Sequence, residues 1–222
     1  MASGLRGVYP SISPQDAIHQ LCTGQGTDLR RLSRADQIRR LEDWLQSQGL
    51  CVPKQAFAQG FVGAGAEHET FIDTVGGCAI KLTHDGRFGH CLRSETATAT
   101  PLDYLKRLAW HNELFGDDLR LHGFLLNTAG LRLVTSQPWI VSHPLKLVPT
   151  QDEIDEFLAL FGFDRVKSYP DGYIYFNPEA RLVIGDAQPT NLLLDIDGNI
   201  RPIDLVIAEP DEPFLQCLTR IP

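Results

Sequence analysis

The segment IGDAQPTNLLL, residues 184–194, and the segment NIRPID, residues 199–204, form the most informative pattern of this 222-residue chain. Two short apolar runs, Leu192–Leu194 and Ile200–Ile203, flank Asp197-Gly198, a dipeptide typical of tight hairpin turns. The first segment begins at Ile184, the last residue of the largely apolar run Arg181–Ile184, and continues as a polar loop. The pattern therefore predicts a strand, a polar loop and a β-hairpin, in that order.

Three polar residues of this pattern are candidates for chemistry. Asp186 lies five positions before Asn191, and Asp204 lies thirteen positions after Asn191. In a purely structural interpretation, Asp186 and Asn191 shape a turn and Asp204 caps a strand. The order of the other motifs in the chain bears on which interpretation holds.

A three-stranded meander is predicted upstream. Phe57 to Glu67 is apolar and glycine-rich, Glu69 to Val75 contains β-forming residues, and Cys78 to Thr83 alternates like a strand. Gly76-Gly77 supplies the hairpin turn between the last two segments.

The meander carries two candidate phosphate contacts. Gly63 and Gly65 have no side chains, so backbone N–H groups there could approach a phosphate, although, taken alone, they are better explained as a glycine-rich bend. A dinucleotide-binding motif needs a third glycine where His68 stands. Lys81 is a cation among apolar strand neighbours and could hold phosphates as a point charge, or lie on an exposed strand face.

The remaining elements follow from caps and periodicity. Thr100-Pro101 begins a helix that Gly116 ends, and the next two apolar runs are strands, so the sheet region has the order β-β-β-α-β-β. Residues 1–50 are predicted to form two or three short helices, one of which begins after Ser33 and ends at Gly49. Thr150 and Glu153 form a capping box for a helix through Phe161. The other predicted strands are Leu119–Leu126, Leu131–Val134, Tyr173–Phe176 and Arg181–Ile184.

In this order, the motifs of residues 59–207 resemble the protein-kinase-like fold. The segment from Asp186 to Asn191 resembles the kinase catalytic loop D-x-x-x-x-N, and the strand around Lys81 resembles the V-A-I-K strand. The chain is most similar to the compact bacterial kinase domain of phage-type polyvalent proteins. The phrases that carry this similarity are Gly86–Gly89, Asn112–Asp117 and the Gln137-Pro138 connector.

The resemblance implies an α+β fold with two lobes. We expect a helical N-terminal extension at residues 1–58 and an N-lobe with a five-stranded antiparallel sheet at residues 59–136. An abbreviated C-lobe at residues 137–222 would carry the catalytic loop and the metal-binding Asp. Only 18 residues follow Asp204, so we expect no large helical lobe and no complete platform for a peptide substrate.

The resemblance also implies ATP- and Mg²⁺-dependent phosphoryl transfer to a hydroxyl acceptor, a small molecule or a protein, of unknown identity. Asp186 would orient the acceptor. Lys81, Gly63 and Gly65 would contact the nucleotide phosphates. Two further cofactor-binding candidates are Glu113 and Gln137, and the metal ligands would be Asn191 and Asp204.

Several features depart from the kinase pattern and leave alternatives open. Ile184-Gly185 replaces the usual His-Arg, and Asp204-Leu205-Val206 replaces D-F-G. A noncatalytic nucleotide-binding pseudokinase or a protein-interaction module is therefore the alternative. The acid that pairs with Lys81 is also open: Glu113 lies on the predicted helix and is preferred, whereas Glu95 precedes it.

Composition restricts the class of protein. The net charge is −8; residues 1–58 carry 7 basic and 5 acidic residues, and the rest carries 13 and 23. An acidic body disfavours nucleic acid as a partner, and the arginines near residues 30–40 are interpreted as a solvated helix face. The five cysteines show no C-x-x-C pair, and no apolar run is long enough to span a bilayer, so we expect a cytoplasmic protein without a membrane partner.

Overall fold

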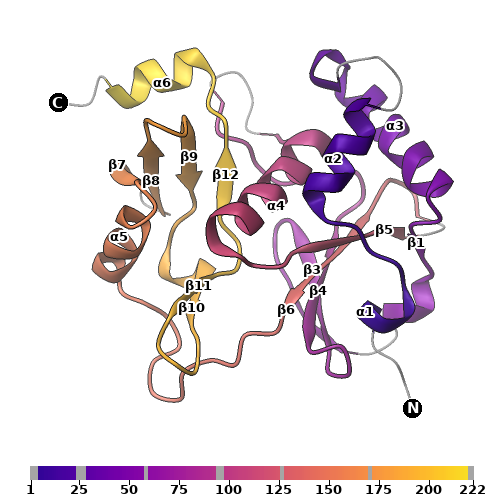
Figure 1. Cartoon of the computed structure of the whole chain (residues 1–222), viewed down its shortest axis with the longest axis horizontal. Coiled ribbons are helices and arrows are strands. Elements are labelled where there is room, and N and C mark those ends of the chain that lie inside the picture. The colour runs from indigo at the N-terminus through magenta and orange to yellow at the C-terminus, as the bar shows by residue number, and fades with distance from the viewer. Residues whose placement is uncertain are drawn as a thin grey trace. The chain divides into compact units, whose positions relative to one another are not determined.

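The computed structural model describes residues 5–23, 29–57, 60–93, 98–125, 128–169 and 172–219 (Figure 1). The chain divides into two compact units. The first contains residues 1–89, 99–112 and 118–139, and the second contains residues 90–98, 113–117 and 140–222. Our boundaries at residues 58 and 136 remain sequence-based predictions. In the described part of the chain, no helix has the length and apolarity needed to cross a membrane.

The first unit begins with helices, as predicted. These are α1 (Leu5–Val8), α2 (Pro14–Thr23), the short 3₁₀ helix η1 (Leu29–Arg31) and α3 (Arg34–Ser47). The Ser33 side chain accepts a hydrogen bond from the backbone N–H of Asp36 and so caps α3. Gly49 follows α3 with a φ of +66°, a conformation that glycine adopts without strain. The predicted start and end of this helix are thus confirmed.

A six-stranded sheet forms the centre of the first unit. Its order is β1-β5-β6-β4-β3-β2, and all neighbours except one are antiparallel. The five expected antiparallel strands are present, but the expected count was one short, because β1 adds a sixth strand that pairs with β5 in parallel. The strand bounds are β1 (Cys51–Val52), β2 (Phe61–Ala64), β3 (His68–Asp73), β4 (Cys78–Thr83), β5 (Arg120–Leu125) and β6 (Leu133–Pro138).

Apolar side chains of the sheet and of the N-terminal extension share one core. The core members are Leu5, Val52, Phe71, Cys78, Ile80, Leu82, Leu125 and Val134, against which Tyr9, Ala56 and Phe57 pack; the last two belong to the 3₁₀ helix η2 (Lys54–Phe57). Because Leu5 and Val52 bury their side chains among sheet residues, the extension is part of the hydrophobic core of this unit.

Helix α4 (Pro101–Phe115) begins at the Thr100-Pro101 signal, as predicted. Thr100 and Asp103 bond to each other's backbone N–H groups at the start of the helix. Helix α3 contacts this region: the Arg34 guanidinium donates to the backbone oxygen of Ala99 and lies 5.5 Å from the centroid of the buried Phe88 ring. The phrase Gly86–Gly89 is therefore contacted by Arg34, which precedes residues 59–207, the segment on which the motif-based resemblance rests.

The second unit contains a four-stranded antiparallel sheet of order β12-β9-β8-β7. The predicted strands β8 (Gly172–Asn177) and β9 (Leu182–Gly185) are confirmed, as is the hairpin of β10 (Leu192–Leu194) and β11 (Ile200–Pro202). Thr150 and Glu153 form the predicted capping box of α5 (Gln151–Ala159). Sequence reasoning missed β7 (Asp164–Tyr169), β12 (Val206–Ala208) and α6 (Glu212–Thr219).

Candidate functional site

The loop after β9 holds Asp186 in an unusual conformation. β9 ends at Gly185, and the next residue, Asp186, has a φ of +56°. Left-handed backbone costs roughly 1 kcal/mol or more in a residue other than glycine, although aspartate tolerates it better than most. Two donors hold the backbone oxygen of Asp186: the side-chain nitrogen of Asn191 at 2.8 Å and the backbone N–H of Gln188 at 2.9 Å. The strained residue is thus fixed by its own loop.

Asn191 also connects this loop to Asp204. The 3₁₀ helix η3 (Pro189–Asn191) ends at Asn191, whose backbone oxygen accepts hydrogen bonds from the N–H groups of Ile203 (2.9 Å) and Asp204 (3.3 Å). Beyond Asp204, strand β12 pairs with β9, with Val206 opposite Gly185. The structure therefore brings Asp186, Asn191 and Asp204 together within the second unit.

Asp186 and Asp204 are neighbouring acids, and the charge of Asp204 affects the pKa of Asp186. Desolvation raises the pKa of the Asp186 carboxyl above its ordinary value, and the negative charge of Asp204 adds to the increase. Hydrogen bonds from Asn191 and Gln188 and the nearby His90 act in the opposite direction. The Gln188 side-chain nitrogen donates to Oδ1 of Asp186 at 3.0 Å, so one carboxylate oxygen already has a donor.

The donor set fits a magnesium ion. Asn191 uses its side-chain nitrogen for the bond to Asp186, so its amide oxygen takes no part in that bond. Asp204, whose backbone N–H bonds to Asn191, is a carboxylate whose charge acts on Asp186. Mg²⁺ prefers such oxygen ligands and keeps several waters, so one carboxylate and one amide are enough protein ligands when substrate phosphates complete the shell.

Lys81 lies on β4 in the first unit. Its register partners are Thr70 on β3 and Thr135 on β6, and its side chain is half-buried between buried strand neighbours. Lys81 thus lies on the third strand of the meander, as predicted. This strand, β4, is an interior strand of the sheet and pairs with β3, the second strand of the hairpin that carries Gly63 and Gly65.

Packing does not explain the glycines of that hairpin. A Cβ atom added at Gly63 would meet no atom within 4 Å, and one added at Gly65 would meet only the backbone oxygen of His68, at 4.0 Å. Neither glycine has the left-handed backbone that excludes other residues. The turn is closed by the Gly65 N–H, which donates to the His68 oxygen at 2.8 Å. Alanine would fit at both positions without a close contact with another part of the protein. The close approach of a ligand to the backbone therefore remains a reason for glycine at these positions.

The other nucleotide candidates have ordinary positions. Glu113 is an exposed residue near the end of α4. Gln137 is buried on β6, in register with Ala79 on β4. Glu95 lies outside the described residues, so the assignment of an acidic partner to Lys81 stays a prediction.

Sequence reasoning missed an ion pair beside the glycine turn. The Arg107 guanidinium of α4 is bound to the Glu67 carboxylate through two hydrogen bonds, and both side chains are largely buried. One residue further, the His68 ring contacts the Tyr104 hydroxyl of α4 at 3.0 Å. Arg107 lies three residues after Tyr104, on the apolar side of the helix, and a charged residue there needs a partner. A charged residue on the apolar side of the predicted helix was thus the sequence signal that could have indicated this ion pair.

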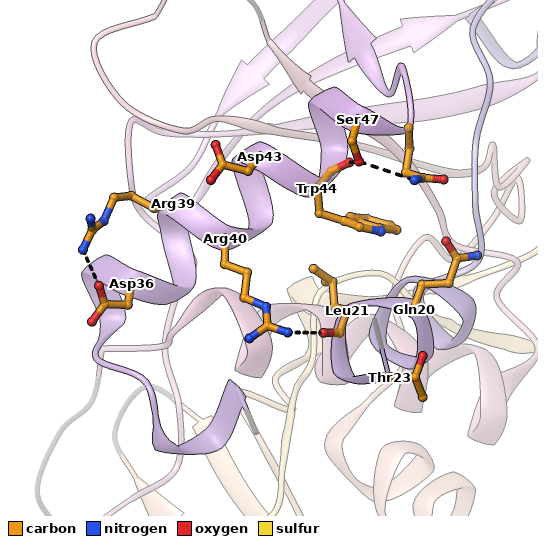
Figure 2. A pocket seen from close by; sticks show the side chains of 10 residues that line it. Gln20, Leu21, Thr23, Asp36, Arg39, Arg40, Asp43, Trp44 and Ser47 are labelled. Carbon is orange, nitrogen blue, oxygen red and sulfur yellow. Dashed lines mark hydrogen bonds and ion pairs between the residues drawn. The ribbon is translucent and has the colours of Figure 1, made fainter. Parts of the chain in front are cut away.

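A separate cavity of about 610 Å³ lies between α2 and α3 (Figure 2). Figure 2 shows Arg40 donating to the backbone oxygen of Leu21, and Arg39 paired with Asp36. The residues that line this cavity include none of the predicted site residues. The cavity therefore belongs to the helical extension and is not part of the candidate site.

Comparison with known proteins gives one match. The family model described as a serine/threonine/tyrosine kinase found in polyvalent proteins matches residues 34–209. No curated protein and no solved structure matches the chain. The matched segment contains Lys81, Asp186, Asn191 and Asp204, and it begins at the first residue of α3, whereas the motif-based resemblance began at residue 59.

Proposed function

The chain belongs to the family of kinases found in polyvalent proteins, and from this membership we propose that it is an ATP- and Mg²⁺-dependent phosphotransferase. The reaction would transfer the γ-phosphoryl group of ATP to a hydroxyl acceptor. The observation that carries the proposal is the connected set of Asp186, Asn191 and Asp204, in which Asn191 bonds to the backbone of both acids.

Each residue of this set has a distinct role in the proposed reaction. The Asp186 carboxylate accepts the proton of the attacking hydroxyl or orients that hydroxyl while its oxygen bonds to the γ-phosphorus. The bond from the γ-phosphorus to the ADP oxygen breaks, and ADP leaves. Asn191 and Asp204 would hold Mg²⁺, which would neutralise charge on the phosphates. A raised pKa makes Asp186 a better proton acceptor than an ordinary surface carboxylate.

Residues of the sheet would bind the nucleotide. We propose that Lys81 contacts phosphates as a point charge and that Gly63 and Gly65 let the backbone of the turn approach them. The pairing of Glu67 with Arg107 would fix the turn to α4. Glu113 and Gln137 are proposed as further nucleotide-binding residues.

The wild-type protein is expected to gain thermal stability from ATP in the presence of Mg²⁺ and to gain far less in its absence. Ligand at 100 times its dissociation constant stabilises the native state by roughly 2.7 kcal/mol, which corresponds to a shift of roughly 5–10 °C for a chain of this size. Differential scanning fluorimetry with ATP and either Mg²⁺ or a chelator measures the difference. Equal shifts in both conditions would contradict the proposed metal site.

Replacement of Lys81 by Met is expected to weaken ATP binding by about tenfold or more with little loss of stability. Methionine keeps the apolar part of the side chain and removes the charge that the phosphates would meet. Titration calorimetry with Mg·ATP measures the affinity, and Lys54→Met, which removes an exposed lysine of the same unit, is the control. If Lys81→Met unfolds while the affinity of the folded fraction is unchanged, Lys81 is a structural residue.

The alternative function is a noncatalytic nucleotide-binding or protein-interaction module. The sequence Asp204-Leu205-Val206 in place of D-F-G and Ile184-Gly185 in place of His-Arg favour it, because both depart from the pattern of active protein kinases. The two functions differ in the role of Asp186, which matters for transfer but not for nucleotide binding.

A further inference from the structure

A chain of hydrogen bonds lies behind the loop that carries Asp186. Gln151, the first residue of α5, donates from its side-chain nitrogen to the backbone oxygen of Ala187 at 3.2 Å. The same nitrogen donates to the Tyr175 hydroxyl at 2.7 Å. Since Ala187 directly follows Asp186, Gln151 holds the peptide group between Ala187 and Gln188, one residue beyond the proposed catalytic residue.

The hydrogen bonds continue from Tyr175 to an ion pair between Asp155 and Arg165. Tyr175 is fully buried on β8, and its hydroxyl donates to the Asp155 carboxylate. Asp155 in turn pairs with Arg165 at 3.1 Å. Burial and the neighbouring Asp155 raise the pKa of Tyr175, so its hydroxyl stays protonated and remains a donor to Asp155. The hydroxyl oxygen is left to accept from Gln151.

The orientation of the Gln151 amide follows from these partners. The Ala187 oxygen accepts only, and the Tyr175 hydroxyl already donates to Asp155, so both positions require the nitrogen of Gln151. The side-chain oxygen of Gln151 is buried and has no hydrogen-bond partner among the described residues. An unsatisfied buried oxygen destabilises the fold. The glutamine therefore supplies two hydrogen bonds through its nitrogen and leaves one buried oxygen without a described partner.

The loop needs this support because of its conformation. Asp186 has left-handed backbone, and its own oxygen is held by Asn191 and by the N–H of Gln188. Gln151 adds a third restraint, on the next peptide group, which joins Ala187 to Gln188. Ala187 is fully buried, so no solvent molecule replaces Gln151 there.

We propose that Gln151 is a positioning residue for phosphoryl transfer, which fixes the Ala187 carbonyl and so keeps the Asp186 carboxylate in its reactive orientation. It touches neither substrate nor metal. This inference rests on the proposed phosphotransferase function. Small displacements of a reacting group cost large factors in rate, so the loss of this restraint acts on turnover and leaves ATP affinity unchanged.

The test is the variant Gln151→Met, which keeps the length and apolar volume of the side chain and removes both donors together with the unpartnered oxygen. We expect kcat for ADP release, per folded molecule, to fall roughly 10- to 100-fold while the KM for ATP stays near its wild-type value. The melting temperature should fall by roughly a few degrees, because the buried Ala187 oxygen loses its donor. Tyr175→Phe should lower kcat less, because the Gln151–Ala187 bond survives. Asp152→Asn, on the exposed side of the first turn of α5, should leave all three quantities unchanged.

The outcomes distinguish failure of the positioning role of Gln151 from failure of the proposed phosphotransferase function. If wild type transfers phosphate and Gln151→Met does so at the same kcat, or loses activity only in proportion to its folded fraction, Gln151 is not a positioning residue. If Gln151→Met melts lower but keeps its turnover per folded molecule, the role is structural. A wild type that transfers no phosphate would overturn the proposed function and this inference with it.

Discussion

Asp186→Asn is expected to bind Mg·ATP as tightly as wild type while its rate of phosphoryl transfer falls by a factor on the order of 10² or more. Asparagine keeps the size of aspartate and tolerates the left-handed backbone at this position, so the loop should keep its shape. It removes the charge and the basicity that the acceptor hydroxyl would use. Binding and turnover should therefore separate in this variant.

A matched control is available in the first unit. Asp118 also combines an aspartate with a positive φ, of 46°, but it lies outside the proposed site and pairs with Arg6. Asp118→Asn should leave both nucleotide affinity and turnover unchanged per folded molecule. If Asp186→Asn instead retains wild-type turnover, Asp186 has no catalytic role.

Asp204→Ala is expected to eliminate the Mg²⁺-dependent part of the thermal shift produced by ATP. Asp204 is the proposed charged metal ligand, and its truncation leaves one neutral amide, which does not suffice to hold Mg²⁺. The expected change is from roughly 5–10 °C to a shift no larger than that seen with chelator. Scanning fluorimetry of variant and wild type at the same nucleotide concentration measures it.

The control for this variant is Asp197→Ala. Asp197 is an exposed aspartate in the turn of the hairpin between β10 and β11, near Asp204 in sequence but without a proposed role. Its replacement should keep the full Mg²⁺-dependent shift. A full shift in a folded Asp204→Ala protein would remove Asp204 from the metal role.

Local signals predicted most of the elements around the site. Helix α4 follows from Thr100-Pro101 and Gly116, and the hairpin after Asn191 follows from Asp197-Gly198, because capping and turn chemistry act within a few residues. Lys81 was placed correctly on the third strand of the meander for the same reason. These predictions needed no information about distant parts of the chain.

Elements that depend on tertiary pairing were missed. β1 and β12 have two and three residues, too few to show an alternating pattern, and each exists because a distant strand accepts its hydrogen bonds. Strand β1 changes the sheet from five strands to six. The integration of the extension into the core likewise depends on Leu5 and Val52 finding partners in β3, β4 and β6.

Sequence patterns also could not identify Gln151 and Arg107, the residues that support the candidate site. Gln151 lies 36 positions from Ala187, and Arg107 lies 40 positions from Glu67, so no local spacing relates them. Kinase-like motifs identified the residues proposed to touch substrate and metal. The residues that hold those motifs in place became visible only with the fold, since long-range contacts determine them.

The most direct test of the phosphotransferase proposal is an incubation of purified protein with γ-labelled ATP over hours, with Mg²⁺ or with chelator. Water or a hydroxyl of the chain itself can serve as a slow acceptor, so ADP release and labelled product report transfer even without the natural substrate. We predict ADP release above the buffer rate with Mg²⁺, and its loss with chelator and in Asp186→Asn. Equal ADP release from wild type, from Asp186→Asn and from buffer would contradict the proposal.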